Sequence, residues 1–285
     1  MRVVQIKNVP VERRSPRGRE GTVEARIIMV GDKTRVDNFH VRVNDIGDKV
    51  YSPRHRHNFD QFIYCLTGEH DYGPNMRLKP RGLAYVPEGT YYGPQNQLPH
   101  RHIAVQFAGP SGSGYLGQDE FAQGFEELKK TGTFEKGIYH PNPGVSGQSN
   151  QDSYEAIWEH IRGRPLTYPQ PQYDGPILMD TDNFPWVPVD DVPGVEEKFY
   201  GTFSSARTRA AQYQLQRGAD FVATGRGLYI ALSGTGSISD EPYSELTTLY
   251  LDQGEIGVFR AETTSEILLL GLPSASRMAS EPPDA

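Results

Sequence analysis

Short hydrophobic runs separated by turn signals fill the first part of the chain. Sequences such as GDK, TGE and PEG stand between the runs, at the spacing that is typical of a β-barrel or a β-sandwich. We therefore expect a series of short strands. The expected strands are 3–9, 23–30, 38–46, 62–68, 82–89 and 102–109.

The hydrophobic pattern changes to a helical period after residue 112. In QDEFAQGFEELKK, Phe121, Phe125 and Leu128 fall on one face of a helix. In NQDSYEAIWEHIRGRP, Asp152 and Glu155 resemble a capping box, followed by an apolar stripe. The sequence thus predicts two short amphipathic helices, which would form a connector or a pad packed on a barrel.

A second series of strands follows a stretch rich in proline and tyrosine. FIYCLTGEH in the first half parallels LYIALSGTG in the second, and each is followed by a strand that begins with glycine. An internal duplication of this kind indicates two similar β-domains. The expected strands of the second series are 197–203, 206–216, 227–234, 246–254, 255–261 and 266–273.

Composition agrees with a folded, strand-rich chain and excludes some functions. Its 285 residues include 30 Gly, 22 Pro, 16 Tyr and 12 Phe, which favour strands joined by tight turns. The net charge of −7 is spread along the sequence, which argues against a nucleic-acid-binding surface. The single cysteine, Cys65, excludes an intrachain disulfide and a multi-cysteine zinc site.

The sequence predicts a protein that neither crosses nor binds a membrane. The first residues, MRVVQIKNVPVERRSP, lack the apolar core of a signal peptide, and no stretch approaches a membrane span. We expect a cytoplasmic protein.

Candidate chemistry gathers at PRHRHNFDQFIYCLTG. Alternate residues of a strand point to the same face, so His55, His57 and Gln61 would offer two nitrogens and an amide oxygen together. Cys65, on the same face, is expected to be a small core residue. The opposite face would pack on a second sheet or subunit. That face comprises Phe62, Tyr64 and Leu66. Asp60, which also lies on the face opposite Gln61, is expected to be solvated or paired with an arginine.

Two groups of residues resemble the motifs of the cupin superfamily. The first group, which resembles the first motif, comprises His55, His57, Gln61 and Gly68. The second group, similar to the second motif, comprises Gly82, Pro87, Gly89, Tyr92 and Asn96. The chain departs from the family pattern at two positions, since Gln61 stands where a glutamate is usual and Tyr92 where a histidine is usual.

The resemblance implies an all-β bicupin, with two jelly-roll barrels and a short helical insert between them. It implies an N-terminal barrel with the metal site, a helical and proline-rich connector, a degenerate C-terminal barrel and a disordered tail. These segments are 1–112, 113–182, 183–274 and 275–285.

The implied site holds one divalent transition metal, which would be zinc, iron or manganese. Its ligands would be His55, His57, Gln61 and Tyr92. Gln61 would bind through its carbonyl oxygen, and Tyr92 only as a phenolate, because the phenol has an ordinary pKa near 10. Alternatively, Tyr92 serves as a general acid or base with His57, and Gln61 lines the barrel as a hydrogen-bonding residue.

Three further histidines leave alternatives open. His100 and His102 could supply a missing nitrogen or be features of a rim or loop, and His40 could line the barrel or have no special role. In the second copy the corresponding positions offer no good ligand, so its barrel is expected to be metal-free. Those positions are Phe221, Ala223, Gly227 and Thr264.

These features predict a metal-dependent enzyme that acts on a small oxygenated substrate, with His57 and Tyr92 as catalytic residues. Isomerase, lyase and dioxygenase chemistry are all compatible with a metal that has open positions. Two alternatives stay open, a metal-free epimerase-like enzyme and a non-catalytic bicupin that binds a small molecule. A homodimer is expected from the resemblance, with no nucleic-acid partner.

Overall fold

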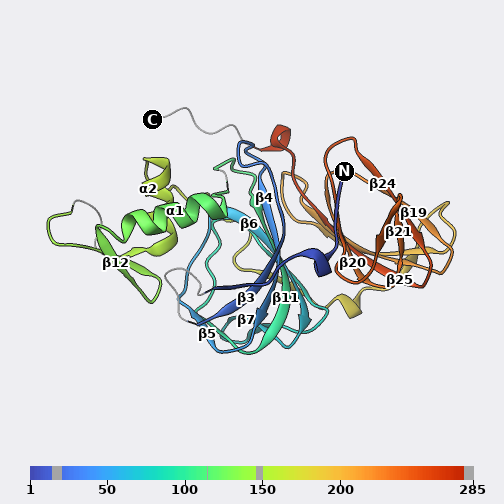
Figure 1. The fold of residues 1–285 in the computed structure, drawn as a ribbon, viewed down its shortest axis with the longest axis horizontal. Helices are drawn as coiled ribbons and strands as arrows, with labels where there is room; N and C mark the ends of the chain where they lie inside the picture. Colours follow the sequence, from blue (N-terminus) through green and yellow to red (C-terminus); the bar gives the residue numbers. More distant parts are fainter. Residues whose placement is uncertain (15–20, 114, 146–149, 279–285) are drawn as a thin grey trace.

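In the computed structural model, the described residues are 1–14, 21–113, 115–145 and 150–278, and they form two β-barrels side by side (Figure 1). The larger sheet of the first barrel has seven antiparallel strands in the order β15-β9-β6-β11-β4-β3-β2. Its strands are β2 (Glu12–Arg14), β3 (Val23–Val30), β4 (Phe39–Ile46), β6 (Phe59–Thr67), β9 (Leu83–Val86), β11 (His100–Ala108) and β15 (Ile177–Met179). Two strand pairs complete this barrel, β5 (Val50–Ser52) with β10 (Gln95–Gln97) and β7 (His70–Gly73) with β8 (Met76–Leu78).

The second barrel repeats this arrangement, which confirms an all-β fold of two jelly-roll domains. Its larger sheet has the order β1-β23-β20-β25-β18-β17-β16, and a four-stranded sheet has the order β19-β24-β21-β22. The larger sheet comprises β1 (Arg2–Val4), β16 (Val187–Pro188), β17 (Val195–Thr202), β18 (Arg209–Leu215), β20 (Gly227–Ser233), β23 (Thr248–Leu251) and β25 (Ser265–Gly271). The smaller comprises β19 (Asp220–Thr224), β21 (Gly236–Ile238), β22 (Glu241–Tyr243) and β24 (Ile256–Ala261).

Each barrel has an edge strand that comes from outside its own predicted segment. The first strand of the chain, β1, pairs with β23 of the second barrel, and β15, from the connector, pairs with β9 of the first. The boundaries 1–112, 113–182 and 183–274 stay a prediction. Two strands pair across them, because β1 lies in the first segment and pairs in the third, and β15 lies in the second segment and pairs in the first. The tail expected over 275–285 begins with a 3-10 turn, η3 (Ala275–Arg277), and lies outside the described residues from 279 onward.

The main hydrophobic core lies between the barrels. Phe62 and Tyr64 of β6 contribute to it from the first barrel, and Leu268 and Leu270 of β25 from the second. The outward face of the strand after the histidine pair therefore packs on a second sheet within the same chain, as one of the two sequence expectations had it. Leu66 is partly buried against the same core.

Apolar side chains fill the interior of the second barrel. Phe221 and Ala223, two of the positions that correspond to metal ligands in the first copy, lie in this core with Tyr229 and Phe259. Residues that are small or aromatic thus occupy the space that the first barrel leaves open.

The helical insert packs on one end of the first barrel. It contains α1 (Gln118–Leu128), α2 (Ser153–Arg162) and a small sheet of β12 (Gly132–Glu135), β13 (Ile138–Pro141) and β14 (Gln151–Asp152). Asp152 caps α2 by accepting from the backbone N–H groups of Tyr154 (2.9 Å) and Glu155 (3.2 Å). Trp158 and Tyr154 pack against Phe59, at the start of β6.

Short 3-10 turns, η1 (Ile6–Asn8) and η2 (Thr181–Asn183), complete the described elements. Among the helices of the described ranges, none has the length and apolar character needed to span a bilayer.

Candidate metal-binding cavity

The first barrel contains a cavity of about 260 Å³ that is partly open to solvent. Its walls come from the strands of the barrel, and the insert contributes Tyr115, Phe121 and Tyr154. Among the described residues that line the cavity there is no aspartate or glutamate, and Arg42 is the one side chain with a fixed charge. The lining is therefore polar but lacks negative charge.

All four residues of the predicted metal site border this cavity. His55 and Tyr92 lie on adjacent segments that exchange two backbone hydrogen bonds of 3.0 Å, and their ring centroids are 4.4 Å apart. The Tyr92 hydroxyl lies 3.3 Å from Nδ1 of His57. The structure thus brings His55, His57 and Tyr92 together. That they bind a metal stays a prediction.

Local contacts fix the orientation of the two motif histidines. His55 Nδ1 lies 2.6 Å from the carbonyl of Pro53, to which it donates, so Nε2 carries the lone pair. His57 stacks on Phe59 with ring centroids 4.3 Å apart, and it meets the ring of Tyr154 edge-on. Both histidines lie in the segment before β6, which begins at Phe59.

Gln61 takes part in a hydrogen-bond network across the sheet. Its carbonyl oxygen accepts from Gln106 Nε2 at 2.8 Å. Gln106 in turn accepts from Arg42 (3.0 Å) and from the hydroxyl of Tyr115 (3.1 Å). His40 lies next to Arg42, at 3.1 Å from its guanidinium. These contacts agree with the interpretation of Gln61 as a lining residue that forms hydrogen bonds.

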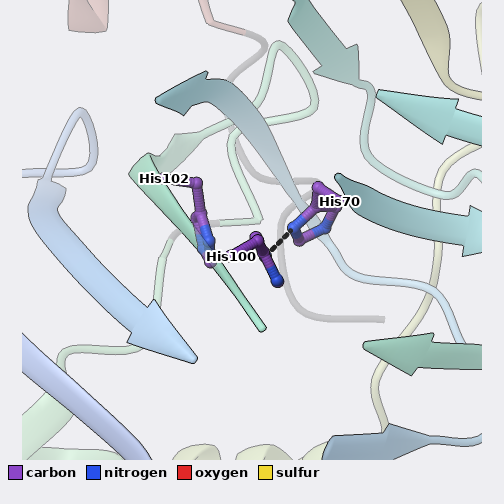
Figure 2. A group of neighbouring side chains, drawn as sticks. All are labelled: His70, His100 and His102. Carbon is purple, nitrogen blue, oxygen red and sulfur yellow. Dashed lines mark hydrogen bonds between the residues drawn. The ribbon is translucent and has the colours of Figure 1, made fainter. Parts of the chain in front are cut away.

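Three other histidines form a cluster in the same cavity. His70 extends from β7, and His100 and His102 extend from one face of β11 (Figure 2). All three are buried, and the ligating atom that each offers lies within 4.8 Å of the other two. His100 and His102 are thus wall residues and not features of a rim or loop. His70 was not predicted from the sequence, because it follows a turn and shows no recognisable spacing.

Hydrogen bonds order two rings of this cluster. His100 Nδ1 donates to the Leu98 carbonyl at 2.7 Å, so its Nε2 accepts from Nδ1 of His70 at 3.0 Å (Figure 2). His70 Nε2 then faces the side-chain amides of Gln95 (3.4 Å) and Gln97 (3.3 Å).

The ring of His102 has fewer hydrogen bonds than the other two rings. Nε2 of His102 lies 2.9 Å from the side-chain amide of Asn44. Nδ1 of His102 and Oδ1 of Asn44 are buried and have no hydrogen-bond partner among the described residues. These two atoms can therefore bind a ligand in this region of the cavity wall.

Burial keeps the three histidines neutral. Desolvation lowers the pKa of His100, and it lowers the pKa values of His70 and His102 well below the ordinary value. The proximity of the other rings adds to the effect on His70 and His102. Neutral imidazole is the form that binds a metal, so these side chains are prepared for coordination at neutral pH.

Asp60, next to Gln61 in β6, does not lie where the sequence predicted. It was expected to be solvated or paired with an arginine, but it is fully buried. Its carboxyl group accepts from the Tyr85 hydroxyl (2.6 Å) and from the backbone N–H of Glu88 (3.0 Å). Burial, together with the nearby Glu88, raises the pKa of Asp60 to about 8.

Comparisons with known proteins identify the fold and little more. No family model matches the chain, and no curated protein matches its sequence. Among solved structures, a candidate dioxygenase from Nostoc punctiforme aligns with a TM-score of 0.64 over 99% of this chain and 87% of its own, at 12% identity. A candidate glyoxylate-induced protein from Pseudomonas aeruginosa aligns with a TM-score of 0.57 over 99% and 90%, at 9% identity.

Oxalate decarboxylase from Bacillus subtilis also shares the arrangement of two barrels, with a TM-score of 0.54 over 95% of this chain and 76% of its own. The sequence identity is 10%. At such identities the alignments establish a common architecture.

Proposed function

On the premise that the chain has the two-barrel fold of the cupin superfamily, we propose that it is a metal-dependent enzyme for a small oxygenated anion. The reaction would take place in the cavity of the N-terminal barrel. The structural neighbours that are described as an oxalate decarboxylase and a candidate dioxygenase support this class of chemistry.

The lining of the cavity is the observation that carries this proposal. The volume of about 260 Å³ is below that of drug-sized sites, which suits a small substrate. With Arg42 as the one fixed charge among the described lining residues, a bound divalent cation would give the cavity an excess of positive charge. A small carboxylate or enolate would balance that charge.

Each part of the wall has a distinct task. Arg42, held by Gln106, presents its guanidinium to an anionic group. The pair of His57 and Tyr92 can move a proton between the imidazole nitrogen and the phenol oxygen. The insert, through Tyr154 and Phe121, covers one side of the cavity. A divalent transition metal in the cavity would supply a Lewis acid that polarises a bound oxygen.

The direct test combines metal analysis with a panel of small acids. We expect the purified protein to contain about one equivalent of a transition metal per chain and to turn over a 2-oxo acid, a 2-hydroxy acid or a catechol in the panel. Arg42→Gln should weaken substrate binding by about 10- to 100-fold, because it removes a charge-assisted hydrogen bond. Arg101→Gln, on the outer face of β11, is the control and should bind as the wild type does. Full activity after the metal is removed would refute the metal-dependent function.

A second prediction separates the two roles open to Tyr92. If its hydroxyl transfers a proton, Tyr92→Phe lowers kcat by about 10²- to 10⁴-fold and leaves the metal content unchanged. Steady-state kinetics and metal analysis of the same preparation measure both quantities. Tyr91→Phe, at the exposed neighbouring position, should leave both values unchanged. A variant that loses its metal together with its activity would make Tyr92 a ligand instead.

The hydrogen bond between Tyr92 and His57 also favours a second candidate, an epimerase-like enzyme that uses this pair without a metal. Such an enzyme would keep its turnover in the presence of a chelator and would lose its turnover in Tyr92→Phe.

A further inference from the structure

We propose that the metal of this cavity binds to His70, His100 and His102, and not to the histidines of the sequence motif. This inference deepens the proposed function and rests on it only in assuming that the cavity takes a divalent metal. The three residues lie outside both motif-like groups of the sequence, so the site would be a different one within the same barrel.

The register of the sheet separates the two groups of residues. In the pairing of β11 with β6, His102 lies opposite Cys65, whereas Gln106 lies opposite Gln61. Four residues of strand correspond to about 13 Å along the barrel wall. The ring of Tyr72 is a neighbour of both groups, with its centroid 4.8 Å from that of His70 and 5.7 Å from that of Tyr92.

The local structure places three nitrogen donors together. His100 and His102 are two positions apart in β11, so both side chains point into the barrel, and His70 approaches them from β7 (Figure 2). Metal–nitrogen bonds of about 2.0–2.1 Å in a tetrahedral site place ligand atoms about 3.4 Å apart. The present spacing, within 4.8 Å, requires shifts of about 1 Å, which side-chain rotations can supply.

The hydrogen-bond pattern is compatible with coordination. The His100 ring donates Nδ1–H to the Leu98 carbonyl, an arrangement that commonly orients a metal-bound histidine. Coordination would replace the hydrogen bond between His70 and His100. The proton on Nδ1 of His70 would move to Nε2. To accept it there, the side-chain amide of Gln95 would turn and give up its hydrogen bond to the Asp71 carbonyl, while Gln97 keeps its hydrogen bonds to the Asp71 backbone.

His102 provides the independent observation that a ligand is missing. Turning the side-chain amide of Asn44 lets its Oδ1 accept from Nε2–H of His102, which removes one of two unsatisfied atoms. Nδ1 of His102 then carries a buried lone pair without a partner among the described residues. A buried imidazole nitrogen whose lone pair accepts no hydrogen bond lowers the stability of the folded state. A bound cation would satisfy that lone pair.

The donor set restricts the metal. Three imidazoles suit zinc, iron, copper or nickel better than magnesium, calcium or manganese, which prefer oxygen. Because no carboxylate lines the described part of the cavity, the ion would keep its full double charge. Its remaining positions would therefore take water, hydroxide or the oxygen of an anionic substrate.

Binding of Co²⁺ and Zn²⁺ to the full-length protein tests this assignment without any measurement of activity. After removal of metal with a chelator, the wild type should bind about one equivalent of Co²⁺ with the visible absorption of a site of low coordination number. His100→Ala and His102→Gln should weaken Co²⁺ binding by at least about a hundredfold. His55→Ala and His57→Ala should bind as the wild type does, and His140→Ala in β13 is the control for loss of a histidine elsewhere.

Thermal unfolding provides the second measurement. Zn²⁺ should raise the Tm of the wild type and of His55→Ala, but not that of His102→Gln, because only a metal bound to the native state stabilises it. The Tm values without metal show whether each variant is folded.

Loss of binding in His55→Ala and His57→Ala, with binding retained in His102→Gln, would overturn the assignment. In that case the motif residues bind the metal, and the proposed function stands. A folded wild type that binds no metal, yet turns over its substrate, would refute the assignment and the metal-dependent function together.

Discussion

Phe62→Ala is expected to lower the free energy of unfolding by about 3–5 kcal/mol, the range for removing a buried phenylalanine. Phe62 is completely buried between the two barrels, with its ring centroid 5.6 Å from Phe107 and 5.7 Å from Phe203 of the second barrel. Alanine would leave a cavity that two stiff sheets cannot close. Urea unfolding followed by tryptophan fluorescence and circular dichroism measures the change.

The matched control is Phe199→Ala, since Phe199 lies in a strand of the second barrel with 53% of its surface exposed. It should change the free energy of unfolding by less than about 0.5 kcal/mol. If Phe62→Ala had an equally small effect, the packing between the barrels would not contribute to stability as the structure indicates. Because Phe62 joins both barrels, a single cooperative transition is expected for the wild type.

Asp60→Asn is expected to remove part of the dependence of stability on pH. The buried carboxyl has a pKa of about 8 in the folded protein, against about 4 in the unfolded chain. Between these values the folded state holds a proton that the unfolded state has released. The contribution of Asp60 to the free energy of unfolding is therefore greatest near pH 4, falls as the pH rises to 8, and is constant above that.

The difference between the variant and the wild type isolates this group. Asparagine keeps an acceptor for the backbone N–H of Glu88 and cannot ionise. Relative to the wild type, Asp60→Asn should gain roughly 1–3 kcal/mol between pH 5.5 and pH 7.5, measured by urea unfolding at each pH. The control Asp240→Asn, at an exposed turn, should show no such trend. A difference that did not change with pH would mean that Asp60 is ionised in the native state.

Local patterns in the sequence predict much of the fold. The strand expected over 23–30 is β3 with the same bounds, and the strand expected over 38–46 is β4 within one residue. The helix that begins after Asp152 also forms where its capping residues place it. Alternation and capping depend on neighbouring residues, so they can be read without knowledge of the tertiary structure.

Features that depend on distant residues could not be predicted in the same way. His70 joins the cluster only because β7 folds back toward β11, and the sequence between them carries no signal of that contact. Asp60 is buried because Tyr85 and the backbone of Glu88, far along the chain, supply its hydrogen bonds. The motif-like spacing located the cavity, whereas the three-histidine cluster required the fold. The homodimer stays a prediction.

Because β1 and β15 lie outside the segments whose sheets they complete, neither predicted barrel segment holds all of its own strands. A gene fragment that encodes only residues 1–112 would leave β9 with a bare edge beside β6. One that encodes only 183–285 would leave β23 with a bare edge beside β20. Exposed edges of this kind attract other chains. The second barrel, whose interior is apolar, therefore contributes to the molecule structurally, because its sheet covers the core face of the first barrel.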